Sequence, residues 1–334
     1  MERMEAKHKR ARLEDVVPRS APFSIFLDPC GACNFKCSFC PCNVSEFQAA
    51  ERHKVMSWEL FEKIAKDLEA FQGQVKVINL YGFGEPLLNP HIVDMVRTLK
   101  ENHLCREVRI TTNASLLDEE KSKGLIAAGV DLLRVSVEAL STEDYQELCG
   151  VKMDVSKVLH NVESFYKLSR GTESKIAAKI VSATLKTERD QQRFFNLFDS
   201  ITDYHFIEKI DAYWAEFDEM VTQEDPVKVN ELCYKETAEK NICTYPFTDM
   251  CIHSNGVIGA CCVDWKFATQ YGDVRYERLS DIWNGEQHRK FQIAHLTKRL
   301  KETVPFCDHC LRKSSDCITN PEQILARLNE IQEA

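Results

Sequence analysis

The 334-residue chain has no long hydrophobic run and no excess of positive charge. It has no apolar stretch of about 18 residues, which a bilayer span requires, and its charged opening MERMEAKHKRARLEDVV is followed by no apolar segment. We therefore expect neither a membrane span nor a secretory signal, and a cytoplasmic location. A formal net charge of −9 argues against a broad phosphate-binding surface, so we expect no nucleic-acid partner.

The chain also lacks internal repeats and low-complexity segments. Cysteine, in contrast, is abundant, with 15 residues. Disulfides are unexpected in a reducing compartment, and a chain of this length does not need them to fold. The cysteines therefore indicate ligation of a metal or an iron-sulfur cluster.

Short β-forming apolar runs alternate with helical patterns from about residue 23 to residue 211. This alternation is typical of a parallel sheet whose strands are joined by right-handed helical crossovers. The predicted strands cover residues 23–28, 75–82, 107–112, 132–138, 175–182 and 205–211. The predicted helices include residues 57–71, opened by Ser57, 90–101, opened by Asn89, 118–128, opened by Asp118, and 155–169.

The pattern changes after about residue 225, where short strand-like pieces surround a turn at Asn255-Gly256. The sequence CDHC follows at residues 307–310, and residues 321–333 form a predicted terminal helix. We predict a flexible tail over residues 1–22, an α/β domain over 23–224, and a linker with a cysteine-organised module over 225–334.

The stretch CGACNFKCSFCPC, residues 30–42, places three cysteines in a C-x3-C-x2-C spacing. Three thiolates can ligate three irons of a 4Fe-4S cluster and leave the fourth iron open for chemistry. A zinc site that uses Cys30 or Cys42 as an additional ligand is the alternative. The loop directly follows the first predicted strand, which places it at the carboxyl end of a parallel sheet, where such folds build their sites.

The motif CNFKCSFC, with Phe39 just before its last cysteine, resembles the signature of the radical S-adenosylmethionine superfamily. The resemblance implies a partial (β/α)6 TIM-like barrel and a 4Fe-4S cluster held by Cys33, Cys37 and Cys40. It also implies reductive cleavage of S-adenosyl-L-methionine (SAM) to a 5'-deoxyadenosyl radical, which then abstracts hydrogen from a substrate. The electron would come from an external one-electron donor such as flavodoxin or ferredoxin.

Three later segments match the same family in the same order. YGFGEP is similar to the family's GGEP segment, with Phe83 in place of the first glycine, and TTNAS and VSVEAL follow the third and fourth predicted strands. The resemblance implies that these segments line the SAM site. The residues it implicates are Phe39, Gly84, Glu85, Pro86, Asn113, Ser136 and Glu138.

The second cysteine set has the spacing C-x12-G-x4-C followed by C-x2-C, which resembles the auxiliary-cluster domain called SPASM or, when shortened, twitch. The resemblance implies a small cysteine-rich domain with one auxiliary 4Fe-4S cluster. Its predicted ligands are Cys243, Cys261, Cys307 and Cys310. The adjacent Cys262 is an alternative to Cys261, and from the residues alone four thiolates would also close a zinc site.

Most of the remaining cysteines are predicted to be small core residues, namely Cys30, Cys42, Cys105, Cys149, Cys233, Cys251 and Cys317. For Cys262 and Cys251 we add the hypothesis that an exposed thiol near the mouth of the barrel donates a hydrogen atom to a substrate radical. His253 and Asp264 are candidates for proton transfer. Acidic and aromatic residues after the sixth strand are candidates for substrate contact, namely Asp211, Tyr213, Trp214, Glu216 and Asp218.

The short lead before the first cluster and the single auxiliary cluster resemble twitch enzymes that act on aminocyclitols, sugars or nucleosides, such as 2-deoxy-scyllo-inosamine dehydrogenase. We therefore predict oxidation of a polar small molecule, with the auxiliary cluster relaying the electron. Redox-neutral epimerisation, dehydration or decarboxylation is the main alternative, and modification of a peptide is another. A non-enzymatic zinc-binding scaffold is a remote one.

Overall fold

The computed structural model describes residues 12–43, 54–208, 242–308 and 318–333. The predicted ligand Cys310 lies outside these residues, as do Cys233, Cys317 and the substrate-contact candidates between residues 211 and 218. The predicted domain boundary at residue 225 also falls outside them, so it stays a prediction. No helix in the described part of the chain is long and apolar enough to cross a membrane.

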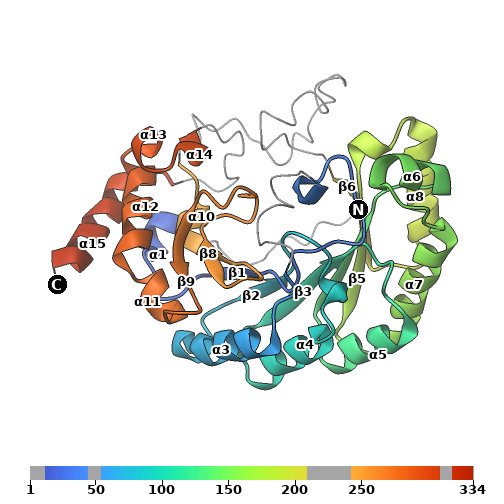
Figure 1. Cartoon of the computed structure of the whole chain (residues 1–334), viewed down its shortest axis with the longest axis horizontal. Helices are drawn as coiled ribbons and strands as arrows, with labels where there is room; N and C mark the ends of the chain where they lie inside the picture. Colours follow the sequence, from blue (N-terminus) through green and yellow to red (C-terminus); the bar gives the residue numbers. More distant parts are fainter. Residues whose placement is uncertain (1–11, 44–53, 209–241, 309–317, 334) are drawn as a thin grey trace.

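All six predicted parallel strands are present. They are β1 (Ser24–Leu27), β2 (Val77–Leu80), β3 (Glu107–Thr112), β4 (Leu132–Val137), β5 (Lys175–Val181) and β6 (Tyr204–Glu208). They lie side by side in the order β6-β5-β4-β3-β2-β1. The helices that connect them lie along the convex side of the curved sheet (Figure 1); they are α3 (Trp58–Leu68), α4 (Ile92–Glu101), α5 (Glu119–Ala127), α6 (Thr142–Cys149), α7 (Val155–Leu168) and α8 (Glu188–Phe198).

Buried and half-buried residues alternate along β3 and β4, because successive side chains of a strand point to opposite faces. The buried set, which includes Ile110 and Leu133, belongs to the same core as the apolar faces of the helices. The half-buried set includes Arg109 and Arg134 and faces the concave side. This polar inner face and apolar outer face confirm the prediction of a partial (β/α)6 TIM-like barrel.

Two predicted helix starts are confirmed by their capping hydrogen bonds. Ser57 Oγ accepts from the Leu60 backbone N–H at 3.2 Å, and Asp118 Oδ1 accepts from Lys121 N–H at 2.7 Å. The third prediction was wrong, because α4 begins at Ile92 and Asn89 does not cap it. Asn89 is fully buried, and its Nδ2 donates to the carbonyls of Pro29 and Met56, on either side of the predicted cluster loop.

The cysteine-rich C-terminal region continues the same sheet. Its first strand, β7 (Asp249–Ile252), pairs in parallel with β1, and the antiparallel strands β8 (Val257–Gly259) and β9 (Gln270–Asp273) follow. Helix α10 (Tyr245–Thr248) precedes β7. The helices that follow β9 are α11 (Leu279–Trp283), α12 (Glu286–Leu296), α13 (Leu300–Thr303), α14 (Pro305–Asp308) and α15 (Pro321–Glu333). The barrel and the module are therefore joined by backbone hydrogen bonds along β1 and β7.

The second half of the predicted flexible tail is packed, so that part of the prediction was wrong. Residues 13–16 form the short helix α1 (Leu13–Val16), and Val17 is fully buried in a cluster with residues of α15. Arg327 of α15 donates hydrogen bonds to the carbonyls of Val17 and Glu14, at 2.7 and 2.6 Å. The two ends of the described chain thus close against each other.

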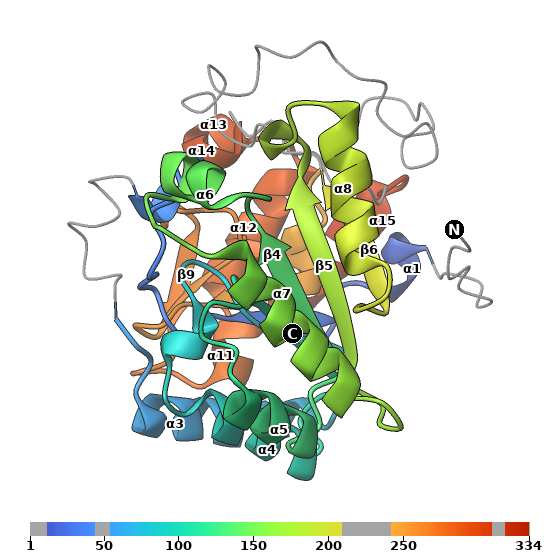
Figure 2. The same cartoon turned by 90° about the vertical axis from the view of Figure 1, so that its right-hand side faces the viewer.

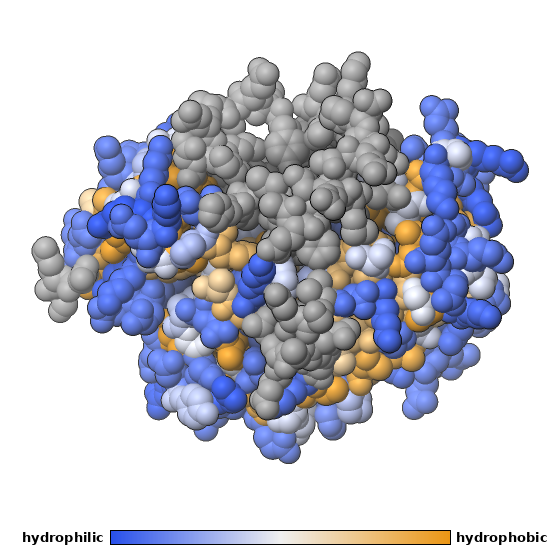
Figure 3. Space-filling view, turned by 45° about the horizontal axis from the view of Figure 1, so that its top comes forward, coloured by the Kyte–Doolittle hydropathy of each residue, from blue (hydrophilic) through white to orange (hydrophobic). Residues whose placement is uncertain are grey.

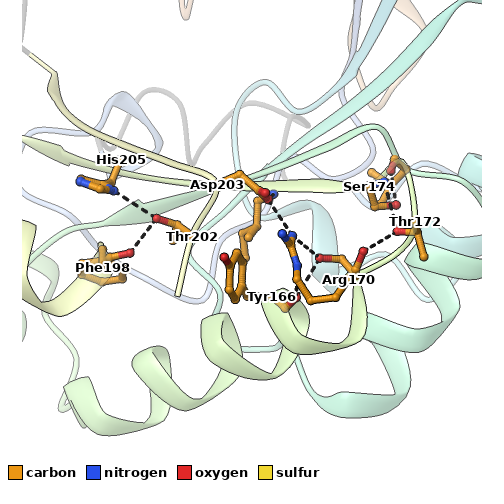
Figure 4. Close-up of polar contacts among 11 residues, drawn as sticks. Tyr166, Arg170, Thr172, Ser174, Phe198, Thr202, Asp203 and His205 are labelled. Carbon is orange, nitrogen blue, oxygen red and sulfur yellow. Dashed lines mark hydrogen bonds and ion pairs between the residues drawn. The ribbon is translucent and has the colours of Figure 1, made fainter. Parts of the chain in front are cut away.

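The opposite edge of the sheet is tied together by a polar network beneath β5 and β6. Arg170, just after α7, donates to the Tyr166 carbonyl at 2.9 Å and to Asp203 at 3.1 Å, and Asp203 also accepts from the Ile176 N–H (Figure 4). This network lies at the amino ends of the strands, and Figure 2 shows α7 and α8 packed against the same edge. We assign it a structural role, because sites in this fold lie at the carboxyl ends.

The outer surface has the polarity expected for helices packed on a sheet. In the face shown in Figure 3, hydrophilic residues dominate both flanks and hydrophobic residues show mainly between them.

Candidate functional site

The predicted cluster loop leaves the carboxyl end of β1 and is fixed by backbone hydrogen bonds. Gly31 N–H donates to the Lys54 carbonyl at 2.9 Å, and Met56 N–H donates to the Pro29 carbonyl at 3.0 Å. Within the loop, Cys40 N–H donates to the Cys37 carbonyl at 3.1 Å. The three predicted ligands therefore sit on a backbone whose path is set by the surrounding protein.

The GEP segment at the end of β2 packs directly on this loop. Glu85 N–H donates to the Ala32 carbonyl at 2.8 Å. Gly84 adopts a φ of +94°, and a Cβ at this position would lie only 2.3 Å from the Cys30 carbonyl oxygen. Glycine is required here for both reasons, because any side chain would push the GEP segment away from the loop.

The Glu85 carboxylate is buried and points into the protein. It accepts from Leu87 N–H at 3.0 Å, from Thr112 Oγ1 at 2.6 Å and from Asn113 N–H at 2.8 Å. Burial nevertheless raises its pKa. These contacts couple the end of β2 to the end of β3 and thereby position the residues around the loop.

The TTNAS segment after β3 holds the cluster loop through side chains. Asn113 Nδ2 donates to Asn34 Oδ1 at 2.9 Å and lies 4.0 Å from Cys33 Sγ, and Asn34 Nδ2 donates to Ser115 Oγ at 2.8 Å. Asn113 was predicted to contact SAM. The structure places it beside the predicted ligand Cys33. No motif in the sequence marks Asn34 and Ser115 as partners of this contact.

Ser136 lies in β4, and Glu138 follows directly after the last residue of that strand. Ser136 pairs with Lys179 of β5 in the sheet register. The pKa of Glu138 is raised to about 7, mainly by burial; the Lys179 charge opposes this shift, and the Glu208 charge adds to it. The charge of Glu138 also raises the pKa of Cys33 and Cys37 and acts in the same direction on Cys40. The end of β4 therefore lies close to the cluster loop.

The three predicted ligands of the first cluster have different neighbours. Cys33 Sγ accepts from Phe35 N–H at 3.4 Å, the Cys37 thiol is hydrogen bonded to Cys149, and Cys40 is hydrogen bonded to Cys42. No three His, Cys, Asp or Glu side chains gather into a metal-binding group within the described ranges. A rotation about one side-chain bond redirects a cysteine sulfur, and three thiols without histidine are the donor set that iron-sulfur clusters take.

The cysteines of the C-terminal module lie near one another although they are distant in sequence. The Cys261 thiol is hydrogen bonded to Cys262, and this bond together with burial raises the pKa of Cys261. Cys251 and Cys243 also act electrostatically on Cys261. These donors are again thiols, which suit an iron-sulfur cluster. The predicted ligand Cys307 is half-buried at the edge of the main core.

Asp264 is part of the framework of this module. Its Oδ2 accepts from Thr269 N–H at 2.6 Å and from Thr269 Oγ1 at 2.7 Å, which closes the turn that follows Cys261 and Cys262. Only 1% of Asp264 is exposed. These contacts give it a structural task, and its predicted role in proton transfer stays a prediction.

A small cavity lies between the barrel and the module, at the carboxyl ends of β2, β1 and β7. Its volume is about 10 Å³, room for about one water molecule, and it is partly open to solvent. Its walls are formed by Phe26, Asp28, Tyr81, Gly82, Phe83, Cys251, Ile252, His253 and Cys262. The predicted proton-transfer residue His253 and the predicted hydrogen donor Cys262 are thus brought to one place.

Asp28 is the unusual member of this wall. It is 4% exposed, and its Oδ1 atom has no hydrogen-bond partner among the described residues. Burial raises its pKa well above the usual range, although hydrogen bonds with the backbone of Phe83 and Cys30 oppose the shift. A buried polar atom without a partner is costly, which makes it a binding group for a hydrogen donor. The sequence offered no signal for Asp28 beyond its place at the end of the first strand.

Family models match both parts of the chain. Residues 27–181 match the radical SAM superfamily, and residues 243–311 match the SPASM iron-sulfur cluster-binding domain. The chain belongs to the radical SAM superfamily and carries a C-terminal SPASM domain. It is an enzyme family, so the zinc-scaffold alternative is not supported. The cofactors of the family are SAM, its cluster and an auxiliary 4Fe-4S cluster, as predicted.

Solved structures share the fold over most of the chain. The structure of BtrN in complex with AdoMet and 2-DOIA is 15% identical and covers 89% of this chain and 96% of its own, with a TM-score of 0.56. Native anSMEcpe with bound AdoMet is 16% identical and covers 93% and 97%, with a TM-score of 0.61. These values indicate a common fold.

Curated relatives match shorter segments. A tungsten-containing aldehyde ferredoxin oxidoreductase cofactor-modifying protein from Pyrococcus furiosus is 35% identical over 118 residues, 35% of this chain and 31% of that protein. A probable GTP 3',8-cyclase from Saccharolobus islandicus is 29% identical over 187 residues, 53% of each chain. The chain therefore spans about a third to a half of the length of the curated relatives that it matches.

Proposed function

We propose that this enzyme abstracts hydrogen from a carbon of a polar small molecule of the sugar, aminocyclitol or nucleoside type, and that it oxidises this substrate with the help of the auxiliary cluster. When bound, the first cluster and SAM supply the 5'-deoxyadenosyl radical that removes the hydrogen atom. In this proposal Cys33, Cys37 and Cys40 hold the first cluster. Cys243, Cys261, Cys307 and Cys310 hold the auxiliary cluster.

The observation that supports this proposal is the cavity at the carboxyl ends of β2, β1 and β7, with Asp28 in its wall. Its unpartnered oxygen suits a hydroxyl or amino group of the substrate, and the apolar rings of Phe26 and Phe83 would exclude water around that contact. The cavity is bounded by the end of β1, from which the cluster loop begins, and by Cys251 and Cys262 of the module. The cavity has room for about one such group, so we assign it to anchoring that group of the substrate between the two cysteine sets rather than to enclosing the whole molecule.

Oxidation of a carbinol to a ketone removes a hydrogen atom, a proton and an electron. The radical takes the hydrogen atom, and we assign the proton to His253, which lies in the cavity wall. The auxiliary cluster, which Cys243, Cys261, Cys307 and Cys310 would hold with no iron left open for substrate, would accept the electron. The electron that starts the reaction comes from an external donor, for which we propose flavodoxin or ferredoxin.

The likeness of the fold to BtrN, a structure that contains AdoMet and 2-DOIA, is compatible with this substrate class. The test combines the anaerobically reconstituted enzyme with SAM, a reductant and a panel of 2-deoxy-scyllo-inosamine, glucosamine and guanosine. Formation of 5'-deoxyadenosine, with transfer of deuterium from a labelled substrate and a product two mass units lighter, would support the proposal. Cleavage of SAM without deuterium transfer from any member of the panel would contradict it.

A redox-neutral reaction such as epimerisation is the second candidate, and one observation favours it. Cys262 lies in the wall of the same cavity, where a thiol could return a hydrogen atom to a substrate radical. In that case the product formed in H2O has the mass of the substrate, and the product formed in D2O carries one deuterium. Cys262→Ala should then stop product formation and leave SAM cleavage intact. Unaltered product from this variant would remove the idea.

A further inference from the structure

Arg134 of β4 stands in a row of side chains that crosses the concave face of the sheet (Figure 1). Residues that pair in register in a parallel sheet point to the same face. Arg134 pairs with Thr111 of β3 on one side and with Ala177 of β5 on the other. Ala177 in turn pairs with Tyr204 of β6. Tyr81, which directly follows β2, borders both this row and the small cavity, so the row leads from the cavity toward β6.

The contacts of the Arg134 guanidinium are with neutral groups. Its Nε donates to Thr111 Oγ1 at 3.1 Å, and its central carbon lies 5.0 Å from the centroid of the Tyr81 ring, within the range of a cation–π contact. Within the described ranges, no carboxylate pairs with this guanidinium. Arg134 is half-buried, so its positive charge lies on the concave face without a counter-ion from these residues.

Two other cations on the concave face already have acidic partners. Arg109 of β3 pairs with Glu107 of the same strand at 2.5 Å, and Lys179 of β5 pairs with Glu208 of β6. Arg134 differs from both, because its neighbours in the row are a hydroxyl and an aromatic ring. A charge that is partly withdrawn from water attracts an opposite charge more strongly than a fully solvated one does. Arg134 is therefore suited to bind an anion.

The position of Arg134 fits a ligand that also reaches Asp28. Neighbouring strands lie about 4.8 Å apart, and the guanidinium reaches back over Tyr81 of β2, the strand beside β1. Asp28 directly follows β1 and lines the small cavity together with Tyr81. One sugar or aminocyclitol ring with an anionic substituent has the length to span both groups. The planar fork of a guanidinium matches the oxygens of a phosphate or a carboxylate.

We propose that Arg134 binds a phosphate or carboxylate group of the substrate, which is therefore an anionic derivative of a sugar, aminocyclitol or nucleoside. The inference rests on the proposed function, because it takes the Asp28 cavity as the place where a hydroxyl or amino group of the same substrate is anchored. Arg134 is then a specificity-determining residue. Neutral molecules of the same class keep the contact with Asp28 and lose the contact with Arg134.

The experiment measures binding without turnover. The reconstituted enzyme with SAM, but without a reductant, is titrated in a phosphate-free buffer with pairs of molecules that differ in one anionic group. The pairs are glucosamine and glucosamine 6-phosphate, guanosine and GMP, and glucose and glucuronate. The wild type is compared with Arg134→Gln and with Arg109→Gln. Arg109 is a matched control, because it also carries a guanidinium on the concave face but is already paired with Glu107.

We expect the wild type to bind the anionic member of at least one pair about tenfold or more tightly than the neutral member, as one charge-assisted hydrogen bond provides. Arg134→Gln should lose this preference and bind the neutral member as before, and Arg109→Gln should keep the preference. Arg134→Lys keeps the charge but not the planar fork, so it should retain part of the preference. Absence of any preference in the wild type would overturn the proposal, and so would a full preference in Arg134→Gln.

Two further measurements separate this inference from its neighbours. SAM also carries a carboxylate, so SAM is titrated into Arg134→Gln, with the iron content as a check on folding. A loss of SAM affinity as large as the loss of affinity for the anionic molecules would assign Arg134 to SAM and overturn the proposal. Deuterium transfer after addition of a reductant tests the proposed function separately. A preference that depends on Arg134 without deuterium transfer would refute the proposed oxidation alone, and deuterium transfer without a preference would refute only the role of Arg134.

Discussion

The two cysteine sets of this enzyme are built in opposite ways. The first lies within one short loop, whose backbone is fixed by β1, by the GEP segment and by the end of α6. The second is dispersed: Cys243 precedes α10, Cys261 follows β8, and Cys307 lies in α14. A local motif needs its surroundings only to hold it in place. A dispersed set exists only after the sheet has brought its members together.

The largest expected effect separates the two sets by their chemistry. Cys33→Ala should reduce iron from about eight to about four per chain and abolish formation of 5'-deoxyadenosine, because the open iron belongs to the first cluster. Iron and sulfide counts and an assay for 5'-deoxyadenosine provide the measurement. Cys105→Ala should behave as the wild type, and SAM cleavage by Cys33→Ala would show that the loop does not carry the reactive cluster.

The matching change in the module should have a different outcome. Cys243→Ala should also lower iron to about four per chain, but SAM cleavage should persist while oxidised product is lost. The adjacent pair can be resolved in the same assay. Iron loss in Cys261→Ala and retention in Cys262→Ala would support the predicted ligand set, and the reverse pattern would assign Cys262 instead.

The barrel and the module can also be compared by how much one buried carboxylate in each contributes to the free energy of unfolding. The Glu85 carboxylate of the barrel accepts hydrogen bonds from Leu87, Thr112 and Asn113, whereas Asp264 Oδ2 in the module accepts from the N–H and the hydroxyl of Thr269. Glu85→Ala should lower the free energy of unfolding by about 3 kcal/mol or more, because it leaves buried donors without acceptors. Asp264→Ala should cost less. Denaturant titration of the apoprotein measures both, and a larger loss for Asp264→Ala would contradict this ranking.

The smallest expected effect is a difference in pH dependence. Burial lowers the pKa of His295 in α12 to about 4, and neither ring nitrogen has a hydrogen-bond partner among the described residues. Between pH 6.5 and 4 the unfolded chain therefore binds a proton that the folded chain does not. Stability should fall over this range as the pH falls, by up to about 3 kcal/mol from this residue. His295→Phe should reduce the dependence of stability on pH over this range. An unchanged slope of stability against pH in this variant would contradict the prediction.

Glu138 of the barrel should act with the opposite sign. Its folded pKa of about 7 lies above the ordinary value of 4.5, so its contribution to stability is present at low pH and is lost as the pH rises from about 4.5 to about 7. Melting profiles of Glu138→Gln against the wild type test this. Relative to the wild type, the variant should become more stable as the pH rises toward neutral. A gain in stability only at acidic pH would contradict the predicted direction.

Much of this architecture could be predicted because it is encoded locally. The alternation of apolar residues along β3 and β4 identifies strands without knowledge of their neighbours, and the side chains of Ser57 and Asp118 mark helix starts. Asn89 shows the limit of such rules. It has the side chain of a helix cap, but burial beside the carbonyls of Pro29 and Met56 gives it a different task, which no local pattern reveals.

The candidate site divides in the same way. The spacing of Cys33, Cys37 and Cys40 and the glycine of the GEP segment are features of the sequence itself, and they led to the superfamily. The contacts of Asn34 with the TTNAS segment join residues about 80 positions apart in the chain. The sequence contains no local trace of such a pairing.

By itself, the sequence determined the superfamily, the order of strands and helices and the type of cofactor, because spacing and periodicity are properties of a linear chain. Only the tertiary structure decided that β7 continues the barrel sheet beside β1, that Asp28 and Cys262 border one cavity, and that Arg134 lies over Tyr81. The physical reason is that burial and hydrogen bonding depend on neighbours in space. In a parallel fold those neighbours come from distant segments whose strand ends meet at one edge of the sheet.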